Sequence, residues 1–254
     1  MTASTRRSAA DPALTRARVL LVGAGGLGCA AARVLVEAGV GALTVLDDDC
    51  VELSNLQRQT LFTDRDIGHA KATIAVERLA ALARDAGHTS DLVAREIRVL
   101  PENARNLLTG HDLVLEGADN FATKFLVADA CALNRVPLVQ AGAVRWVGWT
   151  LANIPGRSAC LRCVFEDVPS GQQDTCAAAG VIGPVVGALG ALQAALALRL
   201  LRGDETAAGE LWSYAALPGT LRRRPVRRQA RCPLCAGRIA ELELSRYAPP
   251  ECAA

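Results

Sequence analysis

Residues 18–46 constrain the fold more than any other part of this sequence. The apolar run RVLLV (18–22) has the length of a strand and ends at the loop GAGGLG (23–28). A stretch compatible with a helix follows up to Gly39, a common C-terminal stop, and residues 41–46 form a second apolar run. Strand, glycine loop, helix and strand in this order are typical of a βαβ unit that binds a nucleotide.

The alternation of strands and helices continues through the first two thirds of the chain. We expect helices at 71–86 and 120–134 and from Pro101 onward, and strands at 91–99, 112–116, 137–142 and 147–154. This alternation predicts an α/β fold with a doubly wound, Rossmann-like and mainly parallel sheet. The second half is mixed, and we expect it to extend the same sheet with antiparallel strands.

The expected organisation is one domain at residues 17–240, between a disordered segment at 1–16 and a tail at 241–254. Within that domain, a nucleotide-binding half covers about 17–145 and a second half covers about 146–240. Slightly more than half of the residues are apolar, which is enough for a sizeable core, and the net charge is +2. A charge this close to neutral gives no reason to expect a nucleic-acid or membrane partner.

The glycine loop and the acid after the second strand predict a phosphate and ribose site. Glycines at 23, 25, 26 and 28 let the backbone turn tightly and approach a phosphate, and the following helix contributes free N–H groups. Asp47 ends the second strand about 20 residues on, where an acid binds ribose hydroxyls. By itself the pattern would suggest a dinucleotide such as NAD, and glycines that serve only packing are the alternative.

The residues that follow Asp47 differ from those of a dehydrogenase. The segment DDDCVELSNLQRQ carries polar side chains, and a lysine opens the next helix; the candidates are Asp49, Asn55, Arg58, Gln59 and Lys71. A guanidinium and an ammonium beside a glycine loop suit a triphosphate better than a nicotinamide. A single Arg or Lys taken alone is more often a solvated surface charge.

Two C-x-x-C pairs predict a structural zinc site. The four cysteines are Cys160, Cys163, Cys232 and Cys235. Two such pairs fill a tetrahedral Zn²⁺ site and leave no open position for catalysis. Incidental thiols or a disulfide are the alternatives. The odd count of nine cysteines and a polar N-terminus favour a reducing, cytoplasmic compartment and argue against disulfides.

Residues 177–198 form an uncharged run long enough to cross a membrane. The run contains Gly183-x-x-x-Gly187, a spacing found where membrane helices pack closely. Glycines and Pro184 interrupt its first half and Gln193 its second. We therefore interpret it as a buried, close-packed helix, with a membrane span as the alternative.

Several sequence blocks together resemble the HesA/MoeB/ThiF family, relatives of the ubiquitin-activating enzymes. The blocks are GAGGLG, TVLDDDCVELSNLQRQTLF, GHAK, EGADNFATKF and the two cysteine pairs, and the resemblance covers about residues 17–237. It implies ATP-dependent adenylylation of the C-terminal Gly-Gly carboxylate of a small ubiquitin-like sulfur carrier protein, with release of pyrophosphate. The product serves molybdopterin, thiamine or related syntheses.

The resemblance also implies roles for single residues. The glycine loop holds the phosphates, Asp47 holds the ribose with Asp49 beside it, and the triphosphate is surrounded by Asn55, Arg58, Gln59 and Lys71. Asp119 holds Mg²⁺ with Asn120 beside it, so the catalytic set is Arg58, Lys71 and Asp119. From the sequence alone, Asp119 could instead cap the helix that follows. The four paired cysteines hold zinc, and members act as homodimers.

Two further features leave alternatives open. Cys176 is a candidate reactive cysteine that joins the carrier covalently in some members, although a single cysteine is more often inert. The other four, Cys29, Cys50, Cys131 and Cys252, are expected to be core or incidental residues. An arginine run at 222–231 is a solvated strand or linker, a nucleic-acid contact, or a dock for an acidic carrier.

Some family features are missing or changed. Members usually carry an R-Y-x-R-Q-like segment well before the first strand, whereas residues 1–17 contain only Arg6, Arg7 and Arg16 in another context. Either the start lies further upstream, or another group replaces this arginine, or activity is weakened. Glu116, Ala118 and Lys124 stand where the family more often has Asp, Thr and Arg. No rhodanese-like domain is attached, so a separate protein is expected to donate sulfur.

Two rival functions follow from these observations. One is an NAD-dependent oxidoreductase built on the same kind of glycine loop, which the Arg58 and Lys71 pair and the cysteine pairs disfavour. The other is a carrier-binding protein that has lost catalysis, suggested by the missing N-terminal arginine.

Overall fold

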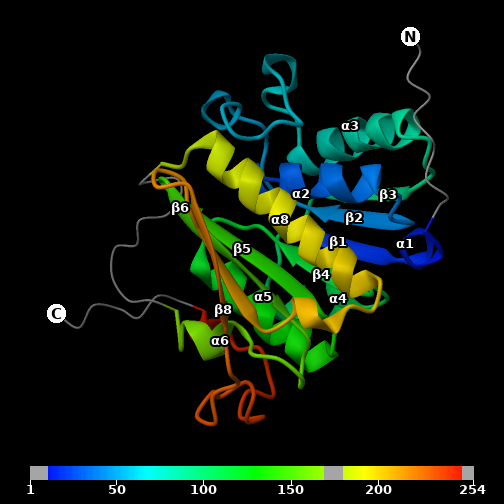
Figure 1. Cartoon of the computed structure of the whole chain (residues 1–254). Helices are drawn as coiled ribbons and strands as arrows, with labels where there is room; N and C mark the ends of the chain where they lie inside the picture. Colours follow the sequence, from blue (N-terminus) through cyan, green and yellow to red (C-terminus); the bar gives the residue numbers. More distant parts are fainter. Residues whose placement is uncertain (1–10, 169–179, 248–254) are drawn as a thin grey trace.

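The computed structural model describes residues 11–168 and 180–247, and its eight strands form one sheet (Figure 1). Their order is β3-β2-β1-β4-β5-β6-β7-β8. The first five are parallel: β1 (Arg18–Val22), β2 (Ala42–Leu46), β3 (Asp91–Arg95), β4 (Leu113–Glu116) and β5 (Leu138–Val144). The last three continue the sheet antiparallel: β6 (Val147–Asn153), β7 (Glu210–Ala215) and β8 (Thr220–Pro225). The predicted α/β fold with a mainly parallel sheet and an antiparallel extension is confirmed.

Helices cover both faces of the sheet, so the central parallel strands β1, β4 and β5 are buried on two sides, whereas the edge strand β3 is largely exposed. The main helices are α2 (Gly26–Glu37), α3 (Lys71–Asp85), α4 (Pro101–Leu108), α5 (Phe121–Asn134) and α8 (Gly183–Leu201). Side chains of β1 alternate between the two cores: Val19 and Leu21 pack with α2, α3 and α8, whereas Leu20 and Val22 pack with α4 and α5. The uninterrupted apolar run of β1 is the consequence of this two-sided burial.

Within the apolar run at 177–198, the residues from Gly183 onward form helix α8, whose boundaries differ from the prediction. The helix begins at Gly183, where Pro184 fits the first turn, and it continues to Leu201. Its length and composition would allow a membrane span, but it lies alongside α2 and against β5 and β6 (Figure 1). A Cβ on Gly190 would lie 2.4 Å from the carbonyl oxygen of Leu27, so this glycine permits the close approach of α2. Gly187 faces open space and is not part of such a contact.

Three expected boundaries are wrong. Residues 12–16 are ordered as helix α1 (Pro12–Arg16), because Asp11 caps it, Pro12 opens it and Leu14 is fully buried. Strand β3 stops at Arg95, which pairs with Leu46 at the end of β2 and whose carbonyl oxygen accepts from the backbone N–H of Asp47 at 3.2 Å. The expected tail is held as far as Tyr247, which is buried. Short helices complete the chain: α6 (Leu161–Val164), η1 (Leu53–Asn55), η2 (Asp64–Asp66), η3 (Glu205–Ala207) and η4 (Leu244–Arg246).

Candidate active site

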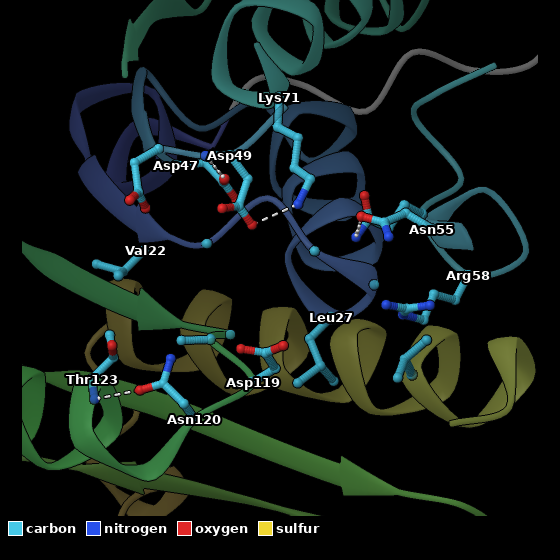
Figure 2. Close-up of a pocket in the computed structure, with 18 of the residues that line it drawn as sticks. Val22, Leu27, Asp47, Asp49, Asn55, Arg58, Lys71, Asp119, Asn120 and Thr123 are labelled. Carbon is cyan, nitrogen blue, oxygen red and sulfur yellow. Dashed lines mark hydrogen bonds and ion pairs between the residues drawn. The ribbon is translucent and has the colours of Figure 1, made fainter. Parts of the chain in front are cut away.

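A cavity of about 680 Å³ opens at the carboxyl ends of β1, β2 and β4 (Figure 2). In the sheet, β2 lies on one side of β1 and β4 lies on its other side, so the chain connections diverge at the carboxyl end of β1. Open α/β sheets bind ligands at such a point. Nearly all of the predicted nucleotide residues line it: Gly23, Gly25, Gly26, Asp47, Asp49, Asn55, Arg58, Gln59, Lys71, Asp119 and Asn120. Four separate stretches of sequence therefore meet at one place.

The fourth glycine of the loop, Gly28, packs against the loop and does not line the cavity. A Cβ on Gly28 would lie 2.0 Å from the carbonyl oxygen of Gly23, so any side chain would separate helix α2 from the loop. The sequence predicted a direct contact between Gly28 and the nucleotide, but Gly28 is not among the residues that line the cavity. Gly23 has a φ of 90°, and its Cβ position lies 3.3 Å from the backbone nitrogen of Ala118. The glycine loop thus rests directly on the loop that follows β4.

Asp47 stands at the end of β2 and ties two loops together. One carboxylate oxygen accepts a hydrogen bond from the backbone N–H of Ala24 at 2.6 Å, and the other accepts from that of Asp49 at 3.0 Å. Burial raises the pKa of Asp47 above its ordinary value, although these two hydrogen bonds oppose the shift. The side chain is therefore fixed in front of the glycine loop.

Two cationic side chains face the same cavity from other elements. Lys71, the first residue of α3, is buried, and its Nζ donates to Asp49 Oδ2 at 2.8 Å. Arg58 follows η1, and its Nη1 donates to the carbonyl oxygen of Ser54 at 3.0 Å. Figure 2 shows both directed toward the space above the glycine loop. Two cationic groups thus face this space, in a cavity that is also lined by acidic side chains: Asp47, Asp48, Asp49, Glu52 and Asp119.

Asn55 and Gln59 form an amide pair beside the two cations. Gln59 Nε2 donates to Asn55 Oδ1 at 3.1 Å, and Asn55 Nδ2 donates to Ser54 Oγ at 2.9 Å. Gln59 Oε1 is buried and has no hydrogen-bond partner within the described residues. Rotation of an amide exchanges its oxygen and its NH₂ group, so this pair can offer a ligand either an acceptor or a donor.

The helix that follows β4 is capped by Asn120 and not by Asp119. Asn120 Oδ1 accepts from the backbone N–H of Thr123 at 2.9 Å, which makes it the N-cap of α5. Capping by Asp119, the alternative that the sequence left open, is therefore wrong. In the described part of the chain the Asp119 carboxylate has no hydrogen-bond partner, and Figure 2 shows it facing the cavity opposite Lys71. A carboxylate that faces a cavity in this way, without a partner among the described residues, is suited to hold Mg²⁺.

The four paired cysteines come together away from this cavity. Cys160 and Cys163 flank and enter α6, and Cys232 and Cys235 follow β8. Sulfur–sulfur distances from Cys160 and Cys163 to the cluster are 3.5 to 3.7 Å. Such distances fit a tetrahedron with Zn–S bonds of about 2.3 Å and are far too long for disulfides of about 2.05 Å. The disulfide alternative is thus wrong, and the cluster fits zinc.

Comparison with known proteins decides the family. The sequence model of the ThiF family matches residues 6–234. The sulfur carrier protein ThiS adenylyltransferase of Escherichia coli is 40% identical over 229 residues, which is 90% of this chain and 89% of that protein. The sulfur carrier protein adenylyltransferase of Thermus thermophilus is also 40% identical, over 92% of this chain and 88% of its own.

The chain belongs to the ThiF family. Its enzyme class is that of these relatives, adenylyltransferase. Among solved structures, Escherichia coli MccB has a similar fold, with a TM-score of 0.77 and 20% identity over 88% of this chain and 68% of that one. Another MccB structure, with ATP, gives a TM-score of 0.76.

Some cavity residues of this ThiF-family chain were missed by sequence reasoning. Ile97, Arg98 and Val99 line the cavity after the end of β3, and Gln57, Thr123 and Val186 line it from other elements. The segment 97–99 could have been found, because it follows the strand next to β2 and carboxyl ends of parallel strands meet at one edge. Cys50, expected to be incidental, is exposed and also lines the cavity.

Other predicted features of this ThiF-family chain lie elsewhere. Arg222, Arg223 and Arg224 are exposed on the edge strand β8, which agrees with a solvated strand. Cys29 and Cys131 are buried in the core as expected. The candidate reactive residue Cys176, together with Cys252, Arg6 and Arg7, lies outside the described residues.

Proposed function

We propose that this enzyme uses ATP to adenylylate the C-terminal Gly-Gly carboxylate of a small ubiquitin-like sulfur carrier protein and releases pyrophosphate. One observation carries the proposal: Arg58, Lys71 and Asp119 converge on a cavity built over the glycine loop. Two relatives that match over nearly nine tenths of their length are named as adenylyltransferases of sulfur carrier proteins. Molybdopterin, thiamine and related sulfur-transfer pathways all use carriers of this chemistry.

The reaction needs positioning and positive charge more than proton transfer. An oxygen of the carrier carboxylate attacks the α-phosphorus of ATP, and the bond from that phosphorus to the α,β-bridging oxygen breaks. Pyrophosphate leaves with the electron pair of this bond. The nucleophile is already ionised at neutral pH, so no general base is required. Both reactants are anions, so the site must hold them together and offset their charge.

The residues of the cavity divide this task. Backbone N–H groups of Gly25 and Gly26, at the start of α2, suit the phosphates, and Asp47 suits the ribose hydroxyls. Arg58 and Lys71 offset the triphosphate charge, for which Lys71 would exchange its present partner Asp49 for phosphate oxygens.

The amides and the acids beside the cations complete the arrangement. Asn55 and Gln59 offer hydrogen bonds to the triphosphate through their exchangeable amide groups. Asp119, free of other partners in the described chain, would hold Mg²⁺, with Asn120 fixing the helix beside it. When bound, Mg²⁺ supplies charge neutralisation on the phosphates.

The remaining parts of the proposal concern scaffold and partners. Zn²⁺ held by the four cysteines would fasten the segment after β8 to α6. We further propose that the enzyme acts as a homodimer, that a separate protein donates sulfur, and that Cys176 is a candidate for a covalent bond to the carrier. The division of the domain into a nucleotide-binding half up to about residue 145 and a carrier-binding half from about 146 belongs to the same proposal.

ATP–pyrophosphate exchange on the zinc-loaded protein tests the function directly. The protein is assayed alone and with a panel of carrier proteins that end in Gly-Gly. Exchange that appears with one carrier supports the reaction and identifies the partner, and a carrier without its last glycine is the control. If a folded, zinc-loaded protein that binds ATP catalyses no exchange with any carrier, the proposed reaction is rejected in favour of a carrier-binding protein that has lost catalysis. Binding of NAD in preference to ATP would instead favour the oxidoreductase.

A further inference from the structure

A buried ion pair lies directly beneath the loop that carries Asp119. Glu116 is the last residue of β4 and is fully buried, and Lys124 on α5 is 4% exposed. Lys124 Nζ lies 3.1 and 3.2 Å from the two carboxylate oxygens of Glu116. Neither side chain lines the cavity. Removing two charges from water is costly, so a pair in this position calls for an explanation beyond packing.

The pair is fully bonded to its surroundings. Gln140 Nε2 donates to Glu116 Oε2 at 3.0 Å and to the carbonyl oxygen of Lys124 at 2.9 Å. Lys124 Nζ also donates to the carbonyl oxygen of Ala141 and lies 5.7 Å from the ring centre of Trp149. A buried network in which every donor has an acceptor is rigid. β4, β5 and α5 are thereby fixed to one another at this end of the sheet.

The network reaches the cavity through the backbone of the loop. Glu116 Oε1 accepts from the backbone N–H of Ala118 at 2.6 Å, and Ala118 immediately precedes Asp119. From the other face of the sheet, Gln193 Nε2 on α8 donates to the carbonyl oxygen of Glu116 at 2.8 Å. Ala118 also lies against Gly23 of the glycine loop. The position of Asp119 relative to the glycine loop is therefore set by these contacts.

We propose that Glu116 and Lys124 are positioning residues for Asp119. The ion pair fixes the turn at Gly117 and Ala118, so that the Asp119 carboxylate faces the triphosphate and its metal. The inference rests on the proposed function, because it takes Asp119 as the Mg²⁺ ligand. Groups that orient a metal ligand typically change metal affinity by about 10- to 100-fold when they are removed.

The test is the double variant Glu116→Met/Lys124→Met. Two apolar side chains of similar length can replace a buried ion pair with little loss of stability, but they give Ala118 no acceptor. ATP affinity is measured by calorimetry in Mg²⁺ and in EDTA, without a carrier. We expect the Mg²⁺-dependent gain in affinity to fall by about tenfold or more, and the affinity in EDTA to change by less than about twofold. A double variant that keeps the whole gain overturns the proposal.

A second buried ion pair on the same helix is the matched control. Asp129 on α5 is fully buried, and Arg162 Nη2 lies 2.9 Å from its Oδ2, but neither residue lines the cavity. Asp129→Met/Arg162→Met is expected to leave both ATP affinities within about twofold of the parent. An equal loss of the Mg²⁺-dependent gain in this control would mean that general rigidity matters and would overturn a specific positioning role.

A third variant keeps the proposal testable if the double variant does not fold. Glu116→Gln retains the size of the side chain but removes the charge that pairs with Lys124 and turns an NH₂ group toward a donor, because both carboxylate oxygens now accept from Lys124 Nζ, so the Mg²⁺-dependent gain is expected to fall by about threefold or more. A folded Glu116→Gln variant that keeps the whole gain would contradict positioning by the ion pair.

Amide exchange at Ala118 separates this inference from the proposed function. Measured by NMR without nucleotide, exchange is expected to accelerate by about tenfold in the Glu116→Met/Lys124→Met variant and not in the control. If amide exchange at Ala118 is unchanged in the Glu116→Met/Lys124→Met variant, the ion pair does not hold the loop and the proposal is overturned. If the Asp119→Asn variant binds ATP with the affinity of the parent both in Mg²⁺ and in EDTA, Asp119 is not the Mg²⁺ ligand. Accelerated exchange at Ala118 in the Glu116→Met/Lys124→Met variant would still show that the ion pair holds the loop.

Discussion

The nucleotide cavity and the cysteine cluster are both built from segments far apart in the sequence, but they differ in what they leave open. Lys71, Arg58 and Asp119 face a space of about 680 Å³. The sulfurs of the cysteine cluster are instead mutually within 4.8 Å. Apolar neighbours including Leu234 and Ile239 surround that cluster. A site that leaves room for a substrate can do chemistry, whereas a closed site can only hold the chain together.

The polar contacts of the cavity and of the cysteine cluster differ in the same way. At the cavity, the Asp119 carboxylate has no partner among the described residues, and Lys71 is paired with a largely exposed Asp49, which a ligand can replace. At the cluster, the backbone N–H groups of Gln229 and Cys235 already point at the sulfurs of Cys163 and Cys232. Hydrogen bonds of this kind orient side chains that ligate a metal. We therefore expect substitution of Asp119 at the cavity to lower activity with little effect on stability. Substitution of a paired cysteine is expected to lower stability without removing a group that takes part in the reaction.

The largest expected effect is on activity at the open site. Asp119→Ala should lower ATP–pyrophosphate exchange by roughly a thousandfold, because the α-phosphate loses its metal-based charge stabilisation. The melting temperature should stay within a few degrees, as the Asp119 side chain makes no hydrogen bond in the described structure. Glu77→Ala, which removes an exposed carboxylate outside the cavity, is the control. Near-parental exchange in Asp119→Ala would remove this residue from the mechanism.

The next effect is on stability at the closed site. Cys232→Ser should reduce the zinc content and lower the melting temperature by roughly 5 to 10 °C, at about 2–4 °C for each kcal/mol in a chain of this size. Zinc is measured by elemental analysis and melting by calorimetry. Cys50→Ser, outside the cluster, should bind the parental amount of zinc. A full zinc complement in the Cys232 variant would contradict the four-cysteine site.

The smallest effect separates two neighbouring residues at the cavity. Asn120→Ala removes the N-cap of α5 and should cost about 1 kcal/mol of unfolding free energy, measured by denaturant titration. Asn120→Ser restores a capping oxygen and should recover most of that loss. If Asn120→Ala were as stable as the parent, the capping assignment would be wrong, and Asp119 would again be a candidate for it.

Much of the fold followed from local patterns in the sequence. The two-sided burial of β1 is matched by apolar residues from Val19 to Val22, and Gly39, with a φ of 82°, ends the turn after α2 where a glycine is favoured. The spacing within each cysteine pair places two sulfurs on one tight turn. These signals lie within a few residues of one another, so the sequence carries them without reference to the rest of the chain.

The division of work inside the cavity could not be obtained in this way. Asp119 and Asn120 are adjacent and chemically similar, and only the start of α5 decides that Asn120 caps the helix while Asp119 faces the cavity. Gly28 belongs to the same motif as Gly25, yet its contact with Gly23 turns it away from the ligand space. In each case a backbone direction, and not a residue type, selects the role.

The sequence by itself determined the βαβ unit, the polar segment after Asp47 and the pairing of the cysteines within each motif. Only the tertiary structure decided that Ala118 rests on Gly23. It also decided that the pair of Glu116 and Lys124 lies beneath the Asp119 loop. Local propensity acts over a few residues, whereas these contacts depend on the order of strands in the sheet, which brings distant segments to one edge.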